Sequence, residues 1–512
     1  MTQLADGSWH RLHPATPLLR GGIAFLALLG IVIANLRERL VEFFIPGVEC
    51  PESLCSEDPI SVILDRYLLL AVLVAAVVLL LIVALFWLSW RMHTFRVTEE
   101  VVEVRSGVVF RSHRKARLDR VQGINVSRPL VARIFGAARL EISAAGSDAN
   151  MQLAYLTSAN ADGLRAEILS RASGIRAQAA SASASEANGD APAAPAGLGE
   201  VARQRIDEFL APELDPNLAP PQSVVTMHAG RLVGSTALSF GTIFFVLVIV
   251  VLAIVMTATD GGPYLLFATI PVLFGFGSFL ANRIVKSLRY SIAATPDGVR
   301  VGFGLLSTSN ETIPPGRIHS VEISQELLWR PADWWTVRVN LASHSSAKGA
   351  AGQRSTTILP VGSRVEVLKV LELVLPGLVT EATRWQIEGG LDDARHGDGF
   401  TTSPRRAAIL RWFSWRRNGF LLFPDAVVLR RGAIWRSLIV VPTARTQSVD
   451  VRQGPLERAL GLSAVQVHTV SGPVSARIGA LDVRDASRLF RGVAAAGVAA
   501  IEADRSHRWG AA

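Results

Sequence analysis

Residues 95–107 read FRVTEEVVEVRSG, and residues 420–432 repeat the pattern as FLLFPDAVVLRRG. Each stretch is followed by two shorter motifs, RVQGI (120–124) and RIFGAARLEI (133–142) in the first case, RTQSV (445–449) and RALGLSAVQV (458–467) in the second. A weaker middle version reads YSIAATPDGVRVG (290–302), RIHSV (317–321) and RPADWWTVRV (330–339).

The internal spacings agree in all three versions. Twelve residues separate the first aromatic from the glycine in Phe95–Gly107, Tyr290–Gly302 and Phe420–Gly432. Thirteen residues separate the two arginines in Arg120–Arg133, Arg317–Arg330 and Arg445–Arg458. A fixed spacing of this kind predicts one structural unit that is used three times.

Each unit combines strand patterns with one helical pattern. Apolar residues alternate loosely on both sides of Gly107 and Gly432, which predicts antiparallel hairpins that turn at glycine. Later strands are expected at Ala138–Ser143, Val337–Leu341 and Val465–Thr469, and closing helices at Asn160–Ala172, Ser363–Leu375 and Val483–Ala495. Ser363 and Asp482 are suitable N-caps. The pattern therefore predicts α+β units of about 80 residues.

The composition argues for a membrane protein and against a nucleic-acid-binding one. The 512 residues are 50% hydrophobic, with a net charge of +9. Only four of the 52 basic residues are lysines, and the arginines are scattered without the basic stripe that a duplex requires. We therefore expect no nucleic-acid partner.

Four apolar segments are candidate membrane spans: Gly21–Leu36, Tyr67–Trp90, Ser235–Ala258 and Pro263–Val285. Gly21–Leu36 is short, with 16 residues, and needs flanking residues that snorkel or a locally thinner bilayer. They form two pairs, each followed by a unit. No ionisable residue lies near the middle of any span, which argues against transport.

Flanking charges set the expected orientation. The loop 37–66 holds three arginines against seven acidic residues, whereas arginines dominate the opposite flanks. The positive-inside rule then places both termini and all three units in the cytoplasm, with the protein in the bacterial inner (cytoplasmic) membrane. Cys50 and Cys55 would face outward, where they are candidates for a disulfide, although two free thiols remain the alternative.

These patterns divide the chain into nine segments. We expect a cytoplasmic leader, a first span pair, a first unit, a linker, a second span pair, a divergent second unit, a second linker, a third unit and a tail. Their bounds are 1–20, 21–90, 91–175, 176–222, 223–285, 286–377, 378–403, 404–502 and 503–512.

The recurring pairs of an arginine and a Gln or His are the first candidate binding residues. They are Arg120 with Gln122, Arg317 with His319, and Arg445 with Gln447. In a strand, residues two apart share one face, so each pair could form an anion- or partner-binding edge. The alternative is a structural arginine that pairs with a local carboxylate.

Aromatic and basic residues before Phe95 and Phe420 are candidates for the membrane interface. They are Trp90 and Arg91 in the first unit, and Trp412, Trp415 and Arg416 in the third. They would lie at the anionic inner leaflet, or the aromatics would pack under the third unit. The sequence has no catalytic motif, metal-binding cluster or cofactor motif, so we expect neither an enzyme nor a metal or cofactor.

Three features of the sequence indicate a family resemblance. They are the leader WHRLHPATPLL (9–19), the span pairs, and the three R-x-Q/H motifs with their following turns. The chain resembles the bacterial pleckstrin-homology-like membrane proteins of the YdbT type. The resemblance implies four transmembrane helices in two pairs, plus three cytoplasmic split β-barrel domains that are each closed by a C-terminal helix. It implies no established catalytic activity.

Two hypotheses follow. The first is a non-enzymatic membrane protein whose three domains recruit protein partners or further copies of the chain, as a scaffold in the envelope and its stress response. The second is a sensor of anionic lipid surfaces. The sequence names no partner.

Overall fold

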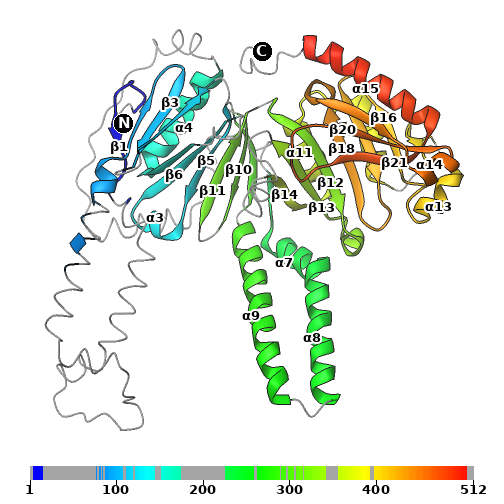
Figure 1. Cartoon of the computed structure of the whole chain (residues 1–512), viewed down its shortest axis with the longest axis horizontal. Coiled ribbons are helices and arrows are strands. Elements are labelled where there is room, and N and C mark those ends of the chain that lie inside the picture. Colours follow the sequence, from blue (N-terminus) through cyan, green and yellow to red (C-terminus); the bar gives the residue numbers. More distant parts are fainter. Residues whose placement is uncertain are drawn as a thin grey trace.

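The computed structural model describes most of the three units and the second pair of apolar segments (Figure 1). The described residues are 4–14, 16, 77, 80–81, 84, 87–107, 111–118, 121–144, 151–173, 225–258, 262–288, 290–295, 298–304, 307–314, 316–341, 356–392 and 397–503. Gly21–Leu36, most of Tyr67–Trp90, Arg120 and both cysteines lie outside these ranges.

Each unit has two halves of three antiparallel strands. The first halves are β2–β4 (Thr94–Val97, Val101–Ser106, Ser112–Arg117), β9–β11 (Ser291–Thr295, Gly298–Phe303, Thr308–Ile313) and β16–β18 (Gly419–Leu422, Ala426–Arg431, Arg436–Pro442). The second halves are β5–β7 (Val121–Arg128, Ala137–Ala144, Met151–Thr157), β12–β14 (Ile318–Gln325, Trp335–Leu341, Thr357–Gly362) and β19–β21 (Ser448–Arg452, Leu462–His468, Ala476–Asp482).

A helix follows each second half, as the sequence predicts. These helices are α4 (Ser158–Ser173), α11 (Arg364–Val374) and α15 (Val483–Ala503). The predicted N-caps are confirmed: Ser363 forms a capping box with Glu366, and the Asp482 carboxylate accepts the N–H of Arg484 at 2.9 Å. Buried leucines and valines of each helix lie in the core of its own unit.

The sheets do not close into three separate barrels but run from one unit into the next. The second half of unit one pairs with the first half of unit two through β5 and β11. The second half of unit two pairs in the same way with the first half of unit three through β12 and β18. Two seven-stranded open sheets result, flanked by the sheets β1–β4 and β19–β21.

Strand β18 shows how such a shared sheet serves two cores. Leu438 and Val440 pack with Val321 and other residues of unit two, whereas Ile439 and Val441 face the core of unit three. Alternate residues of one strand point to opposite faces, so a single strand completes both cores. The boundary between the second and third units is therefore a continuous and largely buried sheet.

A short strand precedes the first half of each unit: β1 (His10–Arg11), β8 (Val225–Thr226) and β15 (Thr401–Thr402). These strands pair in one common register, with His10 opposite Phe95, Val225 opposite Ile292 and Thr401 opposite Phe420. Everything between the short strand and the first half is inserted at one place in the unit. In unit two the insertion is helical: α7 (Ala229–Ala237), α8 (Phe240–Ala258) and α9 (Gly262–Ser287).

The α8–α9 hairpin projects away from the sheets (Figure 1). Within the described ranges no single helix has both the length and the apolar character needed to cross a membrane. Gly230–Ala237 and Phe240–Val255 meet both criteria only as a pair bent by 54°, and Thr269–Val285 is a shorter apolar stretch. The bend interrupts the expected span Ser235–Ala258, because the hydroxyls of Ser239 and Thr242 both donate to the carbonyl of Thr236.

The register of the middle unit differs from the prediction by two residues. Gly304, and not Gly302, has the positive φ that Gly107 and Gly432 also adopt, and a Cβ there would collide with the backbone of Ser307. The first aromatic position is likewise Ile292 instead of Tyr290. A shift of two keeps every side chain on its own face, so alternation alone could not detect it. Thirteen residues then separate the turn glycine from the R-x-Q/H arginine in all three units.

The segment 378–403, expected to be a linker, contains regular structure. Helix α12 (Glu381–Leu391) begins with a capping box between Thr380 and Thr383, and its Ile387 and Leu391 are fully buried. Among the described residues, the shorter helices are α3 (Leu130–Ile134), η3 (Leu327–Ala332), η5 (Arg405–Ala407), α13 (Ala408–Arg411), η6 (Thr443–Arg445) and α14 (Pro455–Ala459).

Candidate functional site

The R-x-Q/H residues of the second and third units meet at the boundary between those units. Arg317 directly precedes β12, His319 lies in β12, and Arg445 ends η6. Burial and the positive charge of Arg445, with a smaller contribution from Arg317, lower the pKa of His319 to about 4. A hydrogen bond to the backbone of Arg445 partly opposes that shift. His319 is therefore neutral at pH 7 and helps to join two units.

The remaining members of this motif are placed differently. Gln447 is exposed, and its backbone N–H donates to the carbonyl of His468 at 2.8 Å. Gln122 lies in β5, and Arg120 is outside the described residues. The structure thus brings together Arg317, His319 and Arg445, while a binding role for the six residues stays a prediction.

In the second unit the second arginine of the repeated pattern, Arg330, also contributes to a boundary. Arg330 donates to the carbonyl of Ala433 and, at 3.0 Å, to that of Ile434. Both carbonyls belong to the β17–β18 turn of the third unit. Asp333 takes the left-handed conformation that Gly136 and Gly461 adopt in the other units, which aspartate tolerates. The divergent second unit therefore keeps the local backbone shape of its neighbours.

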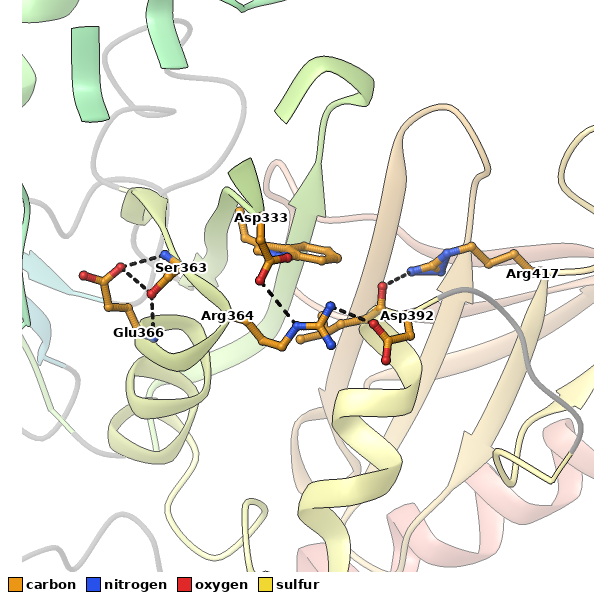
Figure 2. A network of polar contacts seen from close by, with 8 residues as sticks. Asp333, Ser363, Arg364, Glu366, Asp392 and Arg417 are labelled. Carbon is orange, nitrogen blue, oxygen red and sulfur yellow. Dashed lines mark hydrogen bonds and ion pairs between the residues drawn. The ribbon is translucent and has the colours of Figure 1, made fainter. Parts of the chain in front are cut away.

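A polar network links α11, α12 and the third unit (Figure 2). The Arg364 guanidinium binds Asp392 at 2.7 Å and Asp333 at 3.6 Å. Arg417 of the third unit donates to the carbonyls of Gly390 and Leu391, at 2.9 and 3.1 Å. These carbonyls end α12, where positive charge is favourable. Asp392, in a segment expected to be a linker, thus pairs with α11 of the second unit.

Arg430 shows why a basic hairpin does not by itself make a lipid site. Its side chain is fully buried, binds Asp398 at 2.6 Å and lies over the ring of Phe400. It also donates to the carbonyl of Arg417 at 3.1 Å. No headgroup can reach a guanidinium in this position. Sequence reasoning missed this buried pair, because an Arg-rich hairpin has the same composition whichever way its side chains point.

The expected membrane-interface residues of the third unit divide into two groups. Trp412 and the neighbouring Ile409 are each 71% exposed, and Phe413 is also exposed. Trp415 instead packs against the small cluster of Ala407, Leu462 and Ala480, and the Arg416 guanidinium lies 5.4 Å from its ring centroid. We call Ile409, Trp412 and Phe413 the aromatic patch.

The first unit has the same arrangement. The indole of Trp90 donates to the carbonyl of Leu12 at 3.0 Å, and the exposed Arg91 lies over Trp87. Trp87 and Trp412 both stand twenty residues before their turn glycine, so they are equivalent positions. The aromatic patch therefore occupies the place in the third unit where the other two units carry their inserted apolar segments.

Within the described residues no group of His, Cys, Asp and Glu is arranged to hold a metal ion. What the geometry defines is a structural class: three PH-like units, each built from two half-sheets and a closing helix, in one tandem array. A family model described as "Bacterial PH domain" matches residues 54–172, 233–375 and 399–496. The chain thus belongs to the bacterial PH domain family, as the resemblance in its sequence predicted. A search of the curated proteins finds no match for the chain.

Proposed function

We propose that the chain is a non-enzymatic integral protein of the bacterial cell membrane that scaffolds protein assembly. Four spans in two pairs would anchor it, and its termini and three PH-like domains would lie in the cytoplasm. A part in envelope stress is one setting for this role, which growth of a deletion strain under membrane-damaging conditions would test.

The observation that carries the anchor is the apolar surface of the α8–α9 hairpin. Large side chains on α8, including Phe244, Leu247, Val251 and Ile254, are half or more exposed. A hairpin with such a surface, projecting from packed domains, is unfavourable in water and favourable in lipid. The shared sheets support the scaffold role, since they hold three domains in fixed positions relative to one another.

Thiol labelling tests the topology. With a membrane-impermeant maleimide on intact cells, reduced Cys50 and Cys55 should react before lysis. The control places a single cysteine on the third domain, as Ser471→Cys with both native cysteines changed to Ser; Ser471 is exposed, so this cysteine should react only after lysis. The reverse pattern would invert the topology, and labelling of both sites before lysis would refute the anchored arrangement.

Co-purification tests the scaffold. We expect a stoichiometric protein partner to remain bound in native-lipid nanodiscs at high salt. Deleting residues 404–512 is a poor control, because it removes β18 and with it Leu438 and Val440 from the core of the second unit. Point variants on exposed surfaces are the better controls, since they leave the fold intact.

The aromatic patch supports anionic-lipid sensing as a second candidate. Exposed Trp and Phe beside the exposed Arg405 and Arg416 are typical of a surface that enters the headgroup region. Selective enrichment of an anionic lipid, lost in Trp412→Ser and at high salt, would favour this function. The control is Trp385→Ser, which should leave lipid enrichment unchanged, because Trp385 is also exposed. Trp335 is fully buried and is therefore not a suitable control.

A further inference from the structure

The two boundaries between units use the same strands in the same register. At the first boundary Ser127 of β5 lies opposite Ser309 of β11, and at the second Ser324 of β12 lies opposite Ser437 of β18. Ser127 and Ser324 both stand seven residues after their R-x-Q/H arginine. Ser309 and Ser437 both stand five residues after their turn glycine. One interface is therefore built twice.

Each end of the array carries one half of that same interface. Strand β4 is the equivalent of β11 and β18, and it forms one edge of the first sheet. Strand β19 is the equivalent of β5 and β12, and it forms one edge of the last sheet. No described strand pairs with either outer edge. The two sheets lie at opposite ends of the molecule, so the edges of one chain do not meet (Figure 1).

Exposure follows this difference in pairing. Residues 112–115 of β4 are exposed, whereas the equivalent residues 437–440 of β18 are buried. Val451 of β19 is 43% exposed, whereas its equivalents Val126 and Ile323 are fully buried. Both outer edges thus present backbone donors and acceptors that a further strand could satisfy.

We propose that β19 of one copy pairs with β4 of a second copy, so that the protein assembles head to tail through the interface it already uses twice. Equivalence fixes the register, with Arg452 opposite Ser112 and Asp450 opposite Arg114. The partner is a second copy because each chain supplies one edge of each kind. Such an interface is heterologous and builds a ring or a filament.

Charge supports this register. Asp450 would face Arg114 directly across the two strands, and opposite charges in that position are favourable. The proposal deepens the proposed scaffold by naming a partner, but it rests on strand pairing and not on the membrane anchor.

Cysteine pairing tests the interface directly in full-length protein with Cys50→Ser and Cys55→Ser. One tagged chain carries Ser112→Cys and a second, differently tagged chain carries Arg452→Cys. We expect mild oxidation to link the two chains covalently, and each variant alone to run as an unlinked chain on a non-reducing gel. A chain that carries both changes should give a ladder of oligomers on a non-reducing gel.

Two controls make the result decisive. Ser127→Cys with Ser309→Cys places the same pair at the internal boundary and should close within one chain. Arg114→Cys with Arg452→Cys is two residues out of register and should link at least fivefold less. Closure of the internal pair without any linkage between chains would overturn the proposal and mark both edges as end caps. More efficient linkage by the shifted pair would overturn it as well, because the equivalence would then be false.

Exchanging the two charges provides an independent test. The oligomeric fraction is obtained from the particle mass measured in detergent solution. Arg114→Asp and Asp450→Arg should each reduce the oligomeric fraction about fivefold. The double variant should restore it, and this outcome distinguishes pairing across the interface from the local contacts of Asp450 with Arg452 and His468. Additive loss in the double variant would contradict the register. Recovery of the protein in the soluble fraction without detergent would refute the membrane anchor. The results for strand pairing would be unaffected.

Discussion

Glu311 is a buried carboxyl at the boundary between the first and second units. Burial, together with the negative charge of Glu141, raises its pKa to about 8. The side chain is therefore largely protonated at neutral pH. In the unfolded chain the same carboxyl has a pKa near 4.5. Above pH 4.5 the unfolded chain loses this proton while the folded chain keeps it. The contribution of Glu311 to stability is therefore complete below pH 4.5 and is lost as the pH rises through 8.

We expect Glu311→Gln to flatten this dependence. The free energy of unfolding of the first boundary should fall between pH 5 and pH 8 in the wild type, and much less in the variant, with a difference of a few kcal/mol at pH 8. Hydrogen exchange of β5 and β11 across that range measures it. Glu141→Gln removes the second cause and should move the midpoint to lower pH. Equal slopes in wild type and Glu311→Gln would contradict the assignment.

His319 has the opposite sign at the second boundary. The pKa of His319 is about 4 in the folded protein and 6.5 in the unfolded chain. As the pH falls, the unfolded chain therefore takes up a proton before the folded protein does. Stability is complete above pH 6.5 and is lost as the pH falls toward 4. The other two units carry Gln at this position, so His319→Gln uses a residue that the fold already accepts.

The expected effect of His319→Gln is a smaller loss of Tm between pH 7 and pH 5. At pH 5 the difference should be about 1 kcal/mol, because the half-buried ring is partly screened by solvent. Thermal unfolding followed by circular dichroism at both pH values tests it. An equal loss of Tm in the wild type and in His319→Gln would contradict this assignment.

At the level of single elements, β18 divides its side chains between two cores. Val440→Ala should loosen the second unit and Val441→Ala the third, each by about 2 kcal/mol. Hydrogen exchange should therefore rise in β12 and β13 for the first variant, and in β16 and β20 for the second. The two valines are neighbours of the same size and burial, so each serves as the control for the other. Identical exchange patterns would show that the sheet behaves as one core.

The sequence predicts most elements but not how the units join. Period-two alternation, turn glycines and N-caps such as Ser363 are local signals, and they located the later strands and the starts of the closing helices to within three residues. The end of α15 was missed, because the helix continues from Ala495 to Ala503. Pairing between units has no such period. The continuous apolar run Leu438–Val441 does indicate a strand buried on both faces. The equivalent run in β11, NETI at 310–313, is mostly polar and gives no such indication.

The candidate site was predicted only in part, for the same reason. Exposed aromatics could be recognised by composition, as at Trp412, but the packing of Trp415 depends on contacts with Leu460 and Leu462 far along the chain. The buried pair of Arg430 and Asp398 and the contact of Arg364 with Asp392 likewise join residues that no spacing rule connects.

For the whole molecule, the shared sheets mean that no unit is independent of its neighbours. A chain that ends at residue 403 lacks β18 and therefore exposes the edge of β12. A chain that ends at residue 443 keeps β18 and its pairing with β12. We expect β12 and β13 to lose protection from hydrogen exchange in the shorter chain and to keep it in the longer one. Equal protection in the two chains would show that the second unit folds without its neighbour.

The repeated register also makes the number of units adjustable. Removing residues 305–432 would join Gly304 to Ala433, so that β10 leads directly into β18 and β18 pairs with β5. The boundary in such a two-unit chain would keep the register of the present boundaries, with β5 and β18 as a new pair of strands. Duplicating the same 128 residues would lengthen the array by one unit on identical terms. The length of the array can therefore change in whole units while the register of strand pairing stays the same.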